Sequence, residues 1–203
     1  MKPVSRTKEL EAELANTERQ LRLLQKISRY MVRDTGLAKA LDSVVSLVVE
    51  FMHSDSCLLY LLHDKELVLC ASNNPQPATI GHVRLRLGEG LTGWVARERR
   101  LLSISREAYA DPRFKLFTDL PEDTYEAFLS APILVRGRVA GVINVQHRDP
   151  HPHSGGEMEL LTTVGEQVGC LVALASLDSA KLAATDLLEL VMAPAGTGAA
   201  PRH

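Results

Sequence analysis

Four side chains able to bind a transition metal lie close together late in the chain, namely His147, Asp149, His151 and His153. Imidazole and carboxylate groups gathered in this way could ligate zinc or nickel. Two prolines stiffen the same stretch, however, and metal sites usually draw their ligands from separate elements of the fold. We therefore expect a solvated loop here and assign neither a metal site nor a catalytic residue.

The three cysteines, Cys57, Cys70 and Cys170, could supply a nucleophile or a disulfide bond. Their number is odd and no C-x-x-C spacing occurs, which fits a reducing cytoplasm. Two of them lie inside apolar runs and the third lies on an apolar helical pattern. We expect all three to be small buried hydrophobic side chains.

Gly88, Gly90 and Gly93 spell G-x-G-x-x-G, a spacing that occurs in dinucleotide-binding turns. That fingerprint requires a buried parallel strand before it and a full crossover helix after it. Residues 83–87 instead alternate apolar and cationic side chains, as in an antiparallel strand with one wet face. We interpret the glycines as a tight turn into a short helix and expect at least one of them at positive φ.

The bulk composition excludes some classes of partner. With 45% apolar residues and a net charge of −2, the chain can form a core but has no overall field that would attract nucleic acid or an anionic membrane. The first residues contain no apolar h-region, so we expect no leader peptide, and we expect no apolar run of membrane-spanning length.

Residues 8–33 are charged and free of glycine and proline, which favours a helix. Apolar side chains recur on a 4-3 repeat that predicts a two-chain coiled coil. The repeat consists of Leu10, Leu14, Leu21, Leu24 and Met31, with Thr17 and Ser28 at its two polar positions. The alternative is a helix that packs on its own domain.

The remaining pattern alternates helices and strands of moderate length. We expect helices at 37–51, 91–99 and from 157 onward, strands at 56–63, 66–72, 82–87, 101–105, 128–135 and 138–148, and a long loop at 106–123. Pro132 indicates an edge position or a bulge. The order predicts an α+β domain, an antiparallel sheet with helices on one face and a loop lid on the other.

Some polar and aromatic side chains in this pattern allow two interpretations. Tyr109, Phe114 and Phe117 lie in the long loop, which is either a lid or a loop anchored to the core. Trp94 on the short helix is either core filler or the wall of a pocket. Asn144 interrupts the last strand and, if it points inward, needs protein backbone or a ligand as its partner.

Four segments then occur in an order that resembles the GAF domain family: LGEGLTGWV at 87–95, ADPRF at 110–114, FLSAPI at 128–133 and GVINVQH at 141–147. The resemblance covers about residues 37–175. Within the family, it is greatest to the sensory domain of nitrogen-type phosphoenolpyruvate phosphotransferases and to similar domains of bacterial signalling proteins. It implies a six-stranded antiparallel sheet, a ligand cavity between the sheet and residues 106–125, and terminal helices that pair into a dimer.

The resemblance divides the chain into an N-terminal helix at 1–34, a GAF domain at 35–178, and a helical extension with a disordered tail at 179–203. The ligand-binding residues that we expect are Trp94, Tyr109, Asp111, Phe114, Phe117, Tyr125, Leu129 and Asn144. The signature of cyclic-nucleotide-binding members is incomplete here, because its asparagine and phenylalanine are absent. The ligand and any cofactor stay unknown.

We thus expect a cytoplasmic sensory or regulatory domain that binds a small molecule under a lid and signals through its dimer helices. Its partners would be a second copy of the chain, an unidentified small molecule and an effector protein acting in trans, without nucleic acid or membrane. One alternative is a ligand-free dimerisation or protein-interaction module. Another is an enzyme such as a free methionine sulfoxide reductase, but no cysteine lies between Cys70 and Cys170, where that chemistry and bilin attachment would need one.

Overall fold

A computed structural model describes residues 3–33, 36–74, 79–115 and 125–181. The helices are α1 (Pro3–Met31), α2 (Leu37–Met52), α3 (Gly90–Glu98) and α4 (Gly155–Lys181), with a 3-10 turn η2 (Ala108–Ala110). The strands are β1 (Ser56–His63), β2 (Glu66–Ser72), β3 (Arg84–Arg86), β4 (Leu102–Ile104), β5 (Ala127–Val135) and β6 (Arg138–His147). They form one six-stranded antiparallel sheet in the order β3-β2-β1-β6-β5-β4.

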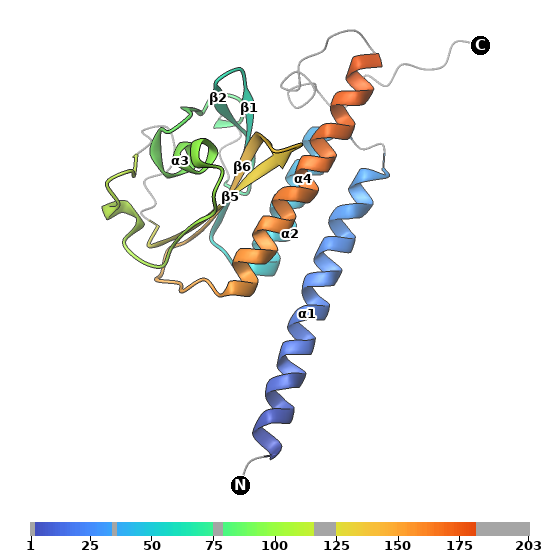
Figure 1. Cartoon of the computed structure of the whole chain (residues 1–203), viewed down its shortest axis with the longest axis vertical. Coiled ribbons are helices and arrows are strands. Elements are labelled where there is room, and N and C mark those ends of the chain that lie inside the picture. Colours follow the sequence, from blue (N-terminus) through green and yellow to red (C-terminus); the bar gives the residue numbers. More distant parts are fainter. Residues whose placement is uncertain (1–2, 34–35, 75–78, 116–124, 182–203) are drawn as a thin grey trace, which may run out of the picture.

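The sheet separates two layers. Helices α1, α2 and α4 stand together on one side of it, and α3 lies on the other (Figure 1). We call these two sides the α4 face and the α3 face. Strand alternation decides which side chain lies on which face, so that Leu59 and Ile143 pack with the helices of the α4 face, whereas Leu58 and Val142 pack with α3 residues. The expected α+β class with a six-stranded antiparallel sheet is confirmed.

The strand bounds follow the sequence patterns closely. Strands β1 and β2 coincide with the predicted segments, and β5 and β6 differ from them by one residue. Strands β3 and β4 are shorter than predicted, three residues each, since they lie at the two edges of the sheet and pair on one side only. Pro132 lies beyond the part of β5 that pairs with β4, so its missing N–H removes no bond to that strand.

Helix α4 corrects one prediction. Residues Gly155–Leu177 are long and apolar enough to span a membrane, by length and composition alone, so the expectation that no run reaches this length was wrong. Their apolar character has a local explanation, because Leu161, Val164 and Val168 are fully buried in the core beside the sheet. The helix is described as far as Lys181, and the rest of the expected tail lies outside the described residues.

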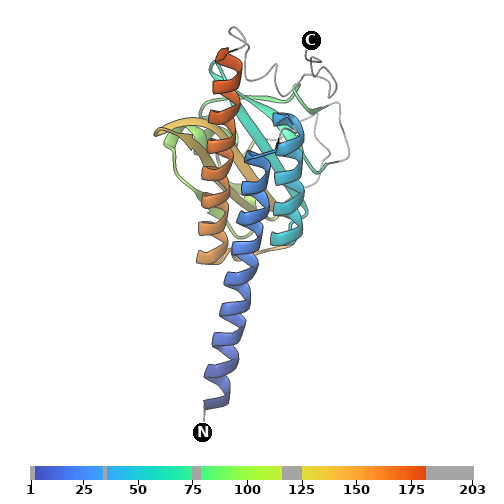
Figure 2. The same ribbon diagram turned by 90° about the vertical axis from the view of Figure 1, so that its right-hand side faces the viewer.

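Helix α1 packs on its own domain over part of its length, which was the alternative to a coiled coil. Its C-terminal part packs on the domain through Leu23 and Ile27, two residues outside the heptad seam, and Leu24 of the seam packs partly there too. Its N-terminal part projects beyond the body of the domain (Figure 2). The seam residues Leu10, Leu14 and Leu21 are exposed, with 57%, 61% and 55% of their surface accessible.

Candidate functional site

A row of polar side chains crosses the α3 face, where the neighbouring positions are apolar. Asn144 on β6 lies opposite Ser130 on β5 in the strand register, and both are buried. The Ser130 hydroxyl donates to Asn144 Oδ1 at 2.7 Å, and Asn144 Nδ2 donates to the Thr92 hydroxyl of α3 at 2.7 Å. Asn144 therefore connects the sheet to α3, because both its amide oxygen and its amide nitrogen are hydrogen-bonded.

The next pair of polar residues on this face, Ser56 and Gln146, lacks hydrogen-bond partners among the described residues. Ser56 of β1 pairs with Gln146 of β6, and strand alternation puts both on the same face as Asn144. The Ser56 hydroxyl and Gln146 Oε1 are buried, and neither has a hydrogen-bond partner among the described residues. Buried polar atoms are normally satisfied by protein, water or ligand, so this pair is a candidate contact for a bound molecule.

Sequence reasoning missed both of these residues. The signal was present for Gln146, which continues the i, i+2 series of Val142 and Asn144 along β6. Ser56 is the first residue of an apolar strand, and no local pattern marks it as a candidate site residue. Only the register of β1 against β6 brings the two side chains together.

The glycine turn fixes α3 above this surface. Gly88 and Gly90 have φ of 87° and 65°, which confirms the prediction of a positive φ in the turn. The backbone folds back so that Gly88 N donates to Gly93 O at 2.7 Å. The Glu89 carboxylate accepts from the Arg86 backbone N–H at 2.8 Å and pairs with Lys115, and these hydrogen bonds hold the pKa of Glu89 below its ordinary value.

One side of α3 is covered by an aromatic and ionic stack. The Arg113 guanidinium lies 4.5 Å from the ring centroid of Trp94, in the geometry of a cation–π contact. Asp111 accepts from Arg113 Nε at 2.8 Å and from its Nη2 at 2.7 Å, and this bidentate pairing lowers the pKa of Asp111. The stack fixes the start of the predicted lid against the helix.

The other expected ligand-binding residues divide into three groups. Phe114 packs with Leu91 and Phe128 on the α3 face, which brings the described part of the loop onto this side of the sheet. Tyr109 is exposed, and its hydrogen bond to Glu126 raises the pKa of its phenol. Tyr125 is half-buried, and Phe117 lies outside the described residues.

Leu129 is separated from the other candidates. It is fully buried in the core of the α4 face and lies opposite Val145 of β6 in the strand register. Its strand is apolar on both faces, so alternation gave no signal to choose between Leu129 and Phe128. Phe128, not Leu129, lies on the α3 face.

The cysteines lie away from the α3 face. Cys57 and Cys70 are buried in the core of the α4 face, as expected, and burial raises the pKa of the Cys57 thiol and raises that of Cys70 to about 11. The expectation for Cys170 was wrong, because its position on α4 faces away from the core and is exposed. The two buried thiols stay protonated at neutral pH and are poor nucleophiles.

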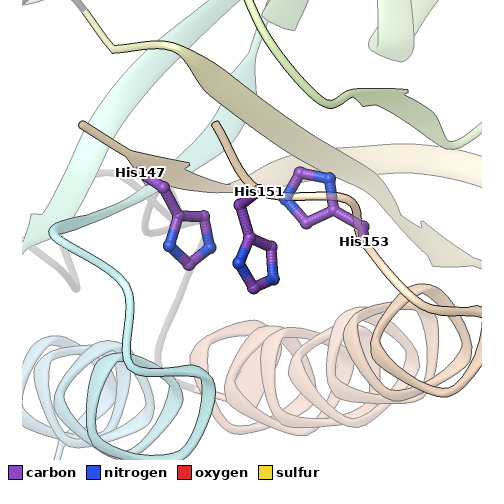
Figure 3. Close-up of side chains that lie close together, drawn as sticks. All are labelled: His147, His151 and His153. Atoms are coloured by element: carbon purple, nitrogen blue, oxygen red, sulfur yellow. The ribbon is translucent and has the colours of Figure 1, made fainter. Parts of the chain in front are cut away.

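The histidine stretch is not the solvated loop that the sequence predicts. His147, the last residue of β6, and His153, beside α4, are buried, while His151 is half-buried and Asp149 is exposed. The three imidazole rings lie together between the sheet and the helices (Figure 3). The two prolines stiffen a turn that folds back under the sheet, which sequence spacing alone did not indicate.

Comparison with known proteins identifies the class to which this fold and these motifs belong. The family model described as GAF domain matches residues 36–172. The chain therefore belongs to the GAF domain family, as the four sequence segments indicated.

Two solved GAF domains from phosphoenolpyruvate-protein phosphotransferases are similar to this chain. The GAF domain from an Acinetobacter phosphoenolpyruvate-protein phosphotransferase is 30% identical, with a TM-score of 0.71 over 78% of this chain and 95% of that one. The corresponding domain from Coxiella burnetii is 27% identical, with a TM-score of 0.74 over 80% and 98% of the two chains. This chain is thus similar to the GAF domains of phosphotransferases, a regulatory and sensory type.

Two further comparisons set the limits of that similarity. The phosphoenolpyruvate-dependent phosphotransferase system protein of Escherichia coli K12 is 27% identical over 156 residues, which are 76% of this chain but 21% of that protein. The chain thus spans about a fifth of the length of the curated relatives it matches. A free methionine-R-sulfoxide reductase from Neisseria meningitidis, in complex with its substrate, is 16% identical with a TM-score of 0.66 over 78% and 91% of the chains, and shares the fold alone.

Proposed function

We propose that this chain is a sensory GAF domain that binds a small polar molecule on the α3 face and passes the binding event to helices α1 and α4. The observation that carries the proposal is the pair Ser56 and Gln146, whose buried oxygens have no hydrogen-bond partner among the described residues. A ligand that donates to Gln146 Oε1 and exchanges a hydrogen bond with the Ser56 hydroxyl would satisfy both. Molecules with amine, amide or hydroxyl groups have this chemistry.

The surroundings of the pair support a selective site. Asn144 is fixed by Ser130 and Thr92, so it presents a rigid neighbour that a ligand does not have to order. Phe128 pairs with Gln146 on the other side and contributes an apolar wall beside Phe114 and Leu91. A few polar atoms set in an apolar surface are typical of small-molecule sites.

We propose a binding role and not catalysis. The thiols of Cys57 and Cys70 lie on the opposite face of the sheet and are held protonated by burial, so neither is placed to attack a molecule bound beside Gln146. We also place the domain in the cytoplasm, where its free cysteines stay reduced. The effector that receives the signal would belong to a longer protein or act in trans.

Signal transfer would use a homodimer. Leu10, Leu14 and Leu21 form an exposed apolar seam on α1, which contacts α4 beside the domain. A ligand that prefers one arrangement of these helices would shift the dimer between two states. The same seam supports a second candidate function, a ligand-free dimerisation module, in which the α3 face binds nothing.

Native mass spectrometry of freshly purified protein tests the ligand and separates the two functions. We expect a stoichiometric small-molecule adduct in the wild type and in Gln167→Met. This control makes the same substitution at a glutamine on α4. We expect its loss in Gln146→Met, which keeps the shape of the side chain but removes the amide oxygen. A wild type free of any adduct that also binds no amino acid or hydroxy acid in calorimetric titration would favour the ligand-free module.

Hydrogen exchange tests the predicted lid. If the loop closes over the ligand, amides at 106–115 should exchange fastest in the free protein and gain protection when the molecule is bound. Strong protection of this segment in the free protein would mean that the loop is simply anchored to the core.

A further inference from the structure

We propose that His147, His151 and His153 form a three-histidine binding site for a divalent first-row transition metal ion, with zinc as the representative ion. The site lies on the α4 face, so it is distinct from the ligand surface beside Gln146 and does not depend on it. Every pair of its ligand nitrogens lies within 4.8 Å. Figure 3 shows the three rings gathered between the end of the sheet and the helices below it.

The ligands come from two parts of the fold. His147 is the last residue of β6, and the other two histidines lie on the connection that leads into α4. The rings of His147 and His151 are stacked with centroids 4.1 Å apart, and the His153 ring lies 5.0 and 5.6 Å from the two. Folding therefore brings the three imidazoles close enough together to bind one metal ion. The sequence alone did not indicate this proximity.

Two of the rings have a nitrogen that is buried and free. His147 is 6% exposed and His153 is 9% exposed. Nε2 of each has no hydrogen-bond partner among the described residues, although a buried imidazole nitrogen normally has one. An imidazole nitrogen that carries no proton can offer its lone pair to a metal ion, which would supply the missing partner of each Nε2.

Two of the histidines have a polar partner on the nitrogen that faces away from the proposed metal. Nδ1 of His153 lies 3.0 Å from the Ser103 hydroxyl of β4, which can accept a hydrogen bond from Nδ1–H and so leave Nε2 as the ligand. Nε2 of His151 lies 2.8 Å from the Glu157 carboxylate, which leaves Nδ1 for the metal. A carboxylate behind a ligating histidine fixes its tautomer and raises its basicity.

The local charge also favours a cation. Burial opposes ionisation of Glu157, but hydrogen bonds from Ser154 and His151 outweigh it and keep the pKa of this carboxyl below its ordinary value. Asp55 and Glu157 both act on His147 as negative charges. Three imidazoles near two carboxylates form a site in which a dication is stabilised.

The expected coordination is that of an open zinc site. With Zn–N bonds of about 2.05 Å, tetrahedral geometry puts ligand nitrogens about 3.4 Å apart, so an ion would draw the outermost pair together from 4.8 Å. The connection between β6 and α4 can supply this movement. Water or an exogenous group would complete the fourth position.

A bound ion would tie the last strand of the sheet to the first turn of α4. His153 and Glu157 flank the N-terminus of α4, and α4 contacts α1. Metal occupancy would therefore fix the angle between the sheet and the helices through which we propose that the domain signals. The site itself stands on its own geometry, whatever the ligand on the α3 face.

The test is a zinc titration of the tag-free, chelator-treated chain, followed by calorimetry and by metal analysis of the gel-filtered protein. We expect one zinc per chain, a rise in Tm with zinc, and visible absorption typical of tetrahedral cobalt when Co²⁺ replaces zinc. His151→Gln, His147→Gln and His153→Gln should each weaken zinc binding more than about 100-fold. His82→Gln, an exposed histidine on the far side of β2, should bind as the wild type does.

A positioning variant sharpens the test. Glu157→Gln keeps a residue that can complete the capping box with Ser154, but it removes the carboxylate behind His151. We expect zinc affinity to fall roughly 10- to 100-fold while the cobalt spectrum stays tetrahedral. His151 is half-exposed, so His151→Gln is expected to fold even if the two buried positions do not tolerate glutamine.

Three results would overturn the proposal. They are a wild type without stoichiometric zinc binding, an affinity that is unchanged in folded His151→Gln, and an octahedral cobalt spectrum typical of adventitious surface binding. None of these results bears on the adduct expected at Gln146, so the two proposals fail separately.

Discussion

The close packing of the turn against α3 predicts how much a substitution at Gly93 would destabilise the fold. Gly93 lies inside α3 at an ordinary φ, so alanine there costs nothing in backbone conformation. A β-carbon at this position would, however, lie 2.5 Å from the carbonyl oxygen of Arg86 and 3.1 Å from the nitrogen of Gly88. Both are backbone atoms that no side-chain rotation can move. Gly93→Ala must therefore push the turn away from the helix.

The magnitude comes from the size of that displacement. A carbon–oxygen contact normally lies at about 3.3 Å or more, so the turn must open by roughly 0.8 Å. Overpacking of this kind costs about 1–3 kcal/mol. The bond from Gly88 N to Gly93 O, 2.7 Å long, would weaken as well. We expect Gly93→Ala to lower the free energy of unfolding by about 3 kcal/mol.

Two companion variants separate the steric cause from other effects. Gly88→Ala acts through its φ of 87°, and its β-carbon would meet only the movable end of Arg97, so a loss of about 1–2 kcal/mol is expected. Gly155→Ala has an ordinary φ and no atom within 4 Å, so it should leave stability unchanged or raise it by up to about 1 kcal/mol.

Urea unfolding followed by far-UV circular dichroism and by Trp94 fluorescence measures all three variants. We expect the free energy of unfolding to be lowest for Gly93→Ala, higher for Gly88→Ala and higher again for the wild type. Gly155→Ala should equal or exceed the wild type. A Gly93→Ala protein within about 0.5 kcal/mol of the wild type would refute this expectation, because the close approach of the turn to the helix would then have no energetic consequence.

Three further predictions concern other parts of the chain. Replacing the exposed Leu14 and Leu21 by glutamate should keep the fold but weaken dimerisation more than about tenfold in sedimentation equilibrium, and a monomeric wild type would remove the coiled coil. Hydrogen bonds from Arg113 lower the pKa of Asp111, so the pair stabilises the fold fully at any pH above the ordinary carboxyl pKa. This stabilisation is lost as the pH falls through the lowered pKa of Asp111. The urea midpoint should therefore fall less steeply on acidification in Asp111→Asn than in the wild type. His147→Leu should raise the stability of the metal-free protein by up to about 1 kcal/mol, since it removes a buried nitrogen without a partner, and should abolish the rise in Tm with zinc; a stability loss above 2 kcal/mol would contradict this.

Local patterns in the sequence determined most of the elements. Alternation and turn residues located β1 and β2 to the residue, and the glycine spacing identified a turn with positive φ before a short helix. These features depend on interactions between near neighbours, such as the steric freedom of glycine and the period of side chains along a strand. The α+β class followed from their order, and the four GAF segments identified the family.

The tertiary structure decided which side chains meet, because periodicity gives a face but not a partner. It put Leu129 in the core of the α4 face, since β5 is apolar on both sides. It buried Leu23 and Ile27 of α1 on the domain and left Leu10, Leu14 and Leu21 of the heptad seam exposed. It paired Ser56 with Gln146 through a strand register that joins residues 90 positions apart. It also folded the connection after β6 under the sheet and so turned an expected surface loop into a buried cluster of three histidines. Burial and hydrogen-bond satisfaction are properties of the packed chain, which is why the sequence contained the residues of both proposed sites but not their arrangement.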